Sequence, residues 1–166
     1  MASTVTEVRG LEGVLSLMSK LPPELVSKKG GVVLSGLRKG ANVMRKAWRE
    51  EVQRLINEPN IGPEYISTGT YQKAISTSRL RKPKEVGGDE AVRVRVRGTP
   101  YPQEGNAKPK NAAMVAGILE HGDEHMEAKA PMRKAFEATS QKALDAVVKA
   151  TNDGIAKAIK KLDKTA

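Results

Sequence analysis

Hydrophobic positions recur with a helical period in two long stretches of the chain, and the first of them predicts a helix over 23–57. Pro23 suits the first helical position, and Pro59 follows the expected end. Gly36 and Gly40 are four residues apart, so they lie on one side of this helix and admit a close neighbour. The predicted apolar face consists of Val33, Leu37, Ala41, Met44, Trp48, Val52 and Leu55.

The second long stretch predicts a C-terminal helix over 131–162, again with Pro131 at its first position. A shorter helix is expected over 112–122, from Ala112 to His121, with Gly122 as the glycine that ends it. Residues 99–111 are rich in proline and lack periodicity, which predicts a loop. The apolar stripe expected on the C-terminal helix consists of Phe136, Ala143, Val147, Ile155, Ala158 and Leu162.

Strict alternation replaces the helical period at Ala91–Arg97, where valine and arginine take turns. This pattern is typical of a strand with one apolar and one charged face. Gly87–Asp89 supplies the turn of a hairpin whose first strand runs from Ile75 to Arg81, so 65–98 forms the sheet. Thr68–Ser76 is expected to form one helical turn that leads into this strand.

These elements predict one domain over 1–166 of the α+β class, with long N-terminal and C-terminal helices packed on a small antiparallel sheet. Residues 1–22 precede the long helix as an N-terminal segment. Aromatic residues make up only 3% of the chain, so the core must consist of aliphatic side chains. Such a core suits closely packed helices better than a deep ligand pocket.

The chain carries a net charge of +10, which favours nucleic acid, an anionic surface or an acidic protein as partner. Composition alone does not choose among them. The absence of cysteine excludes disulfides and thiolate metal sites. No apolar run is long enough to span a membrane, and the N-terminus does not have the pattern of a signal peptide. We therefore expect a protein made in a reducing cytoplasm, with no membrane partner.

The strand places Arg93, Arg95 and Arg97 on one face, about 7 Å apart. Three interpretations stay open for this row: a solvated or subunit-facing surface, contact with a phosphate backbone, or pairing with an acidic partner. No aromatic residues alternate with the arginines, which argues against a platform for stacked bases.

His121 and His125 match the spacing H-x-x-E-H of inverted zinc peptidases. That chemistry requires both imidazoles on one continuous helix, whereas Gly122 follows the first histidine. The sequence favours a polar turn here, with a small metallohydrolase as the remote alternative. The run Gly87–Glu90 is similar to a signature of cyclic-dinucleotide cyclases, but Ala91 stands where phenylalanine is expected, so a hairpin turn is favoured. With no phosphate-binding loop and no nucleophile motif, the sequence predicts a non-enzymatic protein without cofactor or metal.

Three segments, in order, resemble the head–tail joining or tail-completion (neck) proteins of long-tailed bacteriophages. Leu21–Pro23 leads into a long basic helix, and Thr68–Ser76 is similar to the family's Thr-Gly segment that opens the sheet. The third is Leu119–Gly122 followed by Ala130–Phe136, similar to a hydrophobic-Glu-aromatic-Gly turn and a proline-led final helix. The chain departs from this pattern at His121, Met132 and Lys134, where the family has an aromatic, phenylalanine and proline.

The resemblance implies a structural virion protein that assembles in the host cytoplasm as a ring, sixfold to match the tail. Its partners would be copies of itself, the head connector and the tail-terminator or tail-tube proteins, with incidental contact to packaged DNA. Glu120 and Gly122 would form a structural turn before Pro131. The alternative from another class is a small basic DNA-binding accessory protein.

Overall fold

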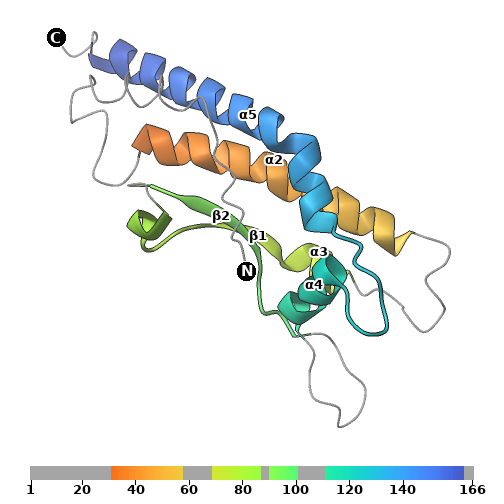
Figure 1. The fold of residues 1–166 in the computed structure, drawn as a ribbon. Helices are drawn as coiled ribbons and strands as arrows, with labels where there is room; N and C mark the ends of the chain where they lie inside the picture. Colours follow the sequence, from red (N-terminus) through yellow and green to blue (C-terminus); the bar gives the residue numbers. More distant parts are fainter. Residues whose placement is uncertain (1–30, 58–68, 87–89, 101–110, 163–166) are drawn as a thin grey trace.

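Two long antiparallel helices and a two-stranded sheet form three layers, with α2 (Gly31–Ile56) in the middle (Figure 1). α5 (Pro131–Leu162) lies along one side of α2, and the sheet lies against the other. The computed structural model describes residues 31–57, 69–86, 90–100 and 111–162. The predicted N-terminal segment 1–22, the turn 87–89 and most of the loop 99–111 fall outside these ranges.

The contact between α2 and α5 depends on small residues. Gly36 and Gly40 are both buried on α2, as their spacing predicted. Gly40 lies against the Ala143 carbonyl and Val147, and Gly36 lies against Thr151 and the Val147 carbonyl. A side chain at either glycine would meet the backbone of α5, so the two helix backbones approach as closely as they do because neither position has a Cβ.

The opposite face of α2 packs on the hairpin and contributes the largest side chains of the core. Trp48 Nε1 donates a hydrogen bond of 2.9 Å to the Tyr71 hydroxyl, and the rings meet edge to face at 6.4 Å. This satisfies both polar groups within an apolar cluster. The buried residues of the cluster are Trp48, Val52, Tyr71, Ile75, Ala116 and Ala135, with Val94 and Val96 packed against them.

The predicted hairpin is present. The short helix α3 (Thr70–Ala74) leads directly into β1 (Ile75–Arg79), which pairs antiparallel with β2 (Val92–Val96), so that Ile75 faces Val96 and Thr77 faces Val94. The strands are joined by residues 80–91, which include a 3-10 helix, η1 (Pro83–Val86). The connection is therefore longer than the tight glycine turn that the sequence suggested.

α4 (Ala112–His121) has the predicted bounds and a side-chain cap at its start. The Asn111 side chain accepts a hydrogen bond of 2.8 Å from the Met114 N–H, which satisfies one of the free donors of the first turn. Ala112 N–H also bonds to the Thr99 carbonyl, and Pro100 pairs with Asn111. The two ends of the predicted loop are thus held together at α4.

The predicted apolar stripes were wrong in part. On α2, the buried set near the N-terminal end is Leu34, Gly36 and Gly40, because the glycine side faces α5. On α5, Phe136 is 39% exposed while Ala135 is 3% exposed, so the inward position is one residue away from the expected one. Periodicity predicted a stripe of large side chains, but helices this close together select small ones.

The α+β class predicted from the sequence is confirmed: the described residues are mostly helical, with one small antiparallel sheet. Among these residues, no helix is both long and apolar enough to cross a membrane.

Candidate interaction surfaces

The predicted arginine row lies on β2, on the face of the sheet directed away from α2. Val94 and Val96 pack toward the core, while Arg93, Arg95 and Arg97 are exposed. Arg93 Nε contacts Ser78 Oγ on β1 at 3.3 Å. In the described part of the chain, the side chains of Arg95 and Arg97 make no hydrogen bond or ion pair. The row therefore presents positive charge that the described carboxylates do not neutralise.

A fourth arginine, which the sequence analysis did not identify, anchors α2 to the hairpin. One guanidinium nitrogen of Arg49 donates to the Ile75 carbonyl at 2.7 Å and to the Lys73 carbonyl at 3.3 Å. In return, the Gln72 side chain donates to the Arg49 carbonyl at 3.0 Å. The only sequence signal was the i, i+4 spacing of Arg45 and Arg49, which occurs on most basic helices.

Positive charge accumulates around Arg49. Burial, and then the charges of Arg45 and Arg97, lower the pKa of Arg49 below its ordinary value. Its Nε is buried without a hydrogen-bond partner. Arg97, next to β2, and the half-buried Arg45, on α2, thus both act on Arg49.

The turn between α4 and α5 is held by Glu120, whose side chain is buried. Its two carboxylate oxygens accept from the backbone N–H groups of Met132 and Arg133, at 2.8 and 3.1 Å. Those are free donors in the first turn of α5, where the helix dipole also favours negative charge. Pro131 is among the most completely buried residues and stands at the first helical position, where its missing N–H costs nothing. Glu120 therefore caps a helix that begins eleven residues further along the chain.

Gly122 ends α4 with a backbone conformation that only glycine adopts easily. Its φ of 77° is in the positive region, but its ψ of 176° differs from the left-handed helical value that is usual for a glycine ending a helix. A Cβ here would lie 2.8 Å from the Met126 carbonyl oxygen and 2.9 Å from the Ala128 nitrogen. The Leu119 carbonyl accepts from both Lys129 and Ala130, which closes the turn. We refer to residues 119–133 as the α4–α5 corner.

The two histidines do not have the geometry that the zinc-peptidase motif requires. α4 ends at His121, and His125 lies in the non-helical segment beyond Gly122. Both imidazoles are exposed, and the His125 Nε2 lies 3.4 Å from the carboxylate of its sequence neighbour Glu124. Within the ranges that the structure describes, no three His, Asp or Glu side chains are grouped as metal ligands. The H-x-x-E-H spacing therefore does not place the two histidines on one helix, as the zinc site of a metalloprotease requires.

Large apolar side chains are exposed at the start of α5. Met132 and Phe136 are one turn apart and are 43% and 39% exposed. On α4, the exposed fraction of Met114 is 55%. Single exposed apolar residues are common on protein surfaces, and this pair on one helical turn forms a small apolar patch beside the α4–α5 corner.

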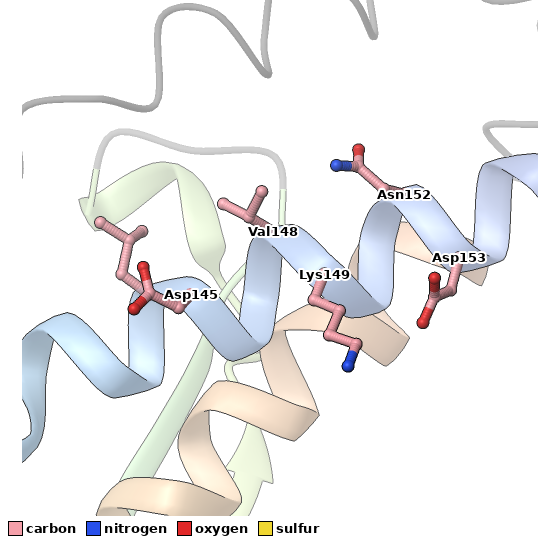
Figure 2. A pocket seen from close by; sticks show the side chains of 6 residues that line it. Asp145, Val148, Lys149, Asn152 and Asp153 are labelled. Carbon is pink, nitrogen blue, oxygen red and sulfur yellow. The ribbon is translucent and has the colours of Figure 1, made fainter.

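A shallow hollow follows the outer side of α5 (Figure 2). Its described lining comes from this one helix and consists of Leu144, Asp145, Val148, Lys149, Asn152 and Asp153. Figure 2 shows the polar side chains spread along successive turns rather than converging on one point. Among the described residues that line this hollow, no two side chains converge as an acid–base pair.

Comparison of the chain with protein-family models, with curated proteins and with solved structures found no match. The functional assignment therefore depends on the chain's own residues.

Proposed function

We propose that this chain is a structural subunit of the neck of a long-tailed bacteriophage, which acts in head–tail joining or tail completion. Support comes from the order of three motifs that resemble the neck family: Leu21–Pro23, Thr68–Ser76, and Leu119–Gly122 with Ala130–Phe136. The second and third motifs lie mostly within the described residues, where they begin the hairpin and form the α4–α5 corner.

The observation that carries the proposal is the corner itself. A Glu-x-Gly sequence followed by a proline-led helix is a weak motif when read as letters. In this fold each of its members has a physical role: Glu120 caps α5, Gly122 makes the positive-φ turn, and Pro131 begins the helix. The contacts of these residues position α5, as expected of an assembly motif.

In this proposal the protein acts by assembly. Each subunit buries apolar surface, including Met132 and Phe136, against a neighbour through a heterologous contact. Such contacts give a closed ring when the rotation between subunits divides a full turn, and a filament when it does not. A sixfold ring would match the tail and offer docking faces to the head connector on one side and to the tail-terminator or tail-tube protein on the other.

Ring formation is the direct expectation. The purified chain, monomeric when dilute, should form rings at high concentration or when it is co-expressed with its neck partners. Light scattering gives the mass of the particle, and negative-stain microscopy gives its symmetry. Met132→Lys together with Phe136→Lys should prevent the rings while leaving the fold intact, since both side chains are exposed. A chain that stays monomeric and binds no connector or tail protein would contradict the proposal.

The alternative is a small DNA-binding accessory protein, favoured by one observation: the exposed row Arg93, Arg95 and Arg97 has no carboxylate partner among the described residues. We expect binding to duplex DNA that is weak, insensitive to length and lost at about 0.15 M salt, since each neutralised phosphate adds about −0.9 to the log–log slope. Submicromolar affinity at that salt, abolished when all three arginines are changed to alanine, would favour the alternative.

A further inference from the structure

We propose that the outer edge of β2 is a docking site for an extended strand of another protein, one in which acidic and apolar residues alternate. The chemistry of the strand defines this partner, whether or not the chain is a neck protein. The docking site is inferred from the direction of the backbone groups of β2, from the charge of one face of the sheet, and from the contrast between the two edges.

The hydrogen-bond pattern determines which backbone groups of β2 point outward. Arg97 N–H bonds to the Ala74 carbonyl at 3.0 Å, and Leu80 N–H bonds to the Ala91 carbonyl at 2.8 Å. Because hydrogen-bonded and non-hydrogen-bonded pairs alternate in an antiparallel ladder, Arg93 and Arg95 belong to the bonded class. The N–H and C=O groups of Val92, Val94 and Val96 therefore point away from β1, and they have no partner within the described residues.

The outer edge of β1 differs, because the backbone groups of its first residue already have hydrogen-bond partners. Ile75 N–H bonds back to Gln72 within the turn of α3, and the Ile75 carbonyl accepts from Arg49. The Ile75 side chain is also fully buried. Of the two edges, β2 thus offers the longer run of unpaired backbone groups, which is the template that strand addition requires.

Side-chain chemistry selects the occupant. A strand added beside β2 would place every second residue on the same face as Arg93, Arg95 and Arg97, directly opposite an arginine. Carboxylates at these positions complement the row, and the intervening residues extend the apolar face formed by Val94 and Val96. A second copy of β2 would set arginine against arginine, which is destabilising. The phosphate backbone of a nucleic acid would pair with the arginines but could not donate to the three outward carbonyls, since phosphate oxygens only accept.

The test titrates the isotopically labelled full chain with a capped peptide of alternating glutamate and valine. There are three control peptides. The first has lysine in place of glutamate, and the second has the same residues in two separate blocks. The third has methyl groups on alternate backbone nitrogens, which block one hydrogen-bonding edge of the peptide. We expect amide shifts centred on 92–97, and affinity at least about tenfold higher for the alternating peptide than for each control. The methylated peptide isolates the contribution of backbone pairing without any change in the protein.

A charge-reversed protein supplies the matched variant. Arg93→Glu with Arg95→Glu should invert the preference, so that the lysine peptide binds about tenfold more tightly than the glutamate peptide. Both side chains are exposed, and an unchanged amide spectrum elsewhere verifies the fold. Equal binding of the block or methylated peptide would overturn the proposal, because charge alone would explain it. So would the absence of binding, amide shifts outside the hairpin, or a duplex oligonucleotide that outcompetes the peptide at about 0.15 M salt.

Discussion

Gly122→Val should lower the free energy of unfolding by about 3 kcal/mol or more. Two costs combine. The backbone of Gly122, at φ 77° and ψ 176°, lies in a region that β-branched residues scarcely populate. The added Cβ would also lie 2.8 Å from the Met126 carbonyl oxygen, which belongs to the backbone and cannot rotate away. Thermal or denaturant unfolding measures the loss, and tail-joining competence should fall with it.

The control for this prediction is His125→Ala, with and without a chelator. The His125 imidazole is exposed and lies beside the equally exposed Glu124 carboxylate, so its removal should change the unfolding free energy by less than about 0.5 kcal/mol. A zinc site would reverse the order of the two variants, because the chain has only two histidines and no cysteine to replace a lost ligand. If chelation or His125→Ala proved as damaging as Gly122→Val, the interpretation of the corner as a structural turn would be wrong.

Gly40→Ala should lower the free energy of unfolding by about 2 kcal/mol, even though alanine is the better helix former. The new Cβ would come within 2.8 Å of the Ala143 carbonyl oxygen and closer still to Val147. To accept it, α2 and α5 must move apart along the face where they are in closest contact. Chemical unfolding measures the difference, and the midpoint should fall without a change in the denaturant slope.

Gly117→Ala is the matched control, because Gly117 is also helical, on α4, and a Cβ there meets nothing within 4 Å. This variant should gain up to about 1 kcal/mol from helix propensity. The change from glycine to alanine is thus expected to lower the free energy of unfolding at Gly40 and to raise it at Gly117. Stabilisation by Gly40→Ala would mean that the two long helices are not packed as closely as described.

Much of this fold could be predicted from local patterns. Alternation of valine and arginine identified β2 and its two faces correctly, because a strand repeats every two residues whatever surrounds it. Gly122 predicted the end of α4, and Pro131 predicted the start of α5, because glycine and proline limit or extend the conformations open to their own backbone. The spacing of Gly36 and Gly40 likewise indicated a close neighbour on that side of α2.

What sequence could not predict depends on residues far apart in the chain. The inward position on α5 is Ala135 rather than Phe136, because Ala135 packs into the cluster that contains Trp48 and Tyr71, which come from distant parts of the chain. Glu120 caps the first turn of α5, a role that no local capping signature records, since donor and acceptor are separated by a turn of irregular chain. Arg49 links α2 to the hairpin only because the fold brings the Lys73 and Ile75 carbonyls within reach of its guanidinium group.

Electron microscopy of phage lysates tests the central claim most directly. If the chain is a neck protein as proposed, an early stop codon in its gene should leave DNA-filled heads and separate tails, which join into virions when the purified protein is added. The Gly122→Val protein should fail to restore joining, whereas His125→Ala should restore it. Complete, infectious virions formed without the protein, or heads and tails that the wild-type protein does not join, would contradict the assignment to the neck.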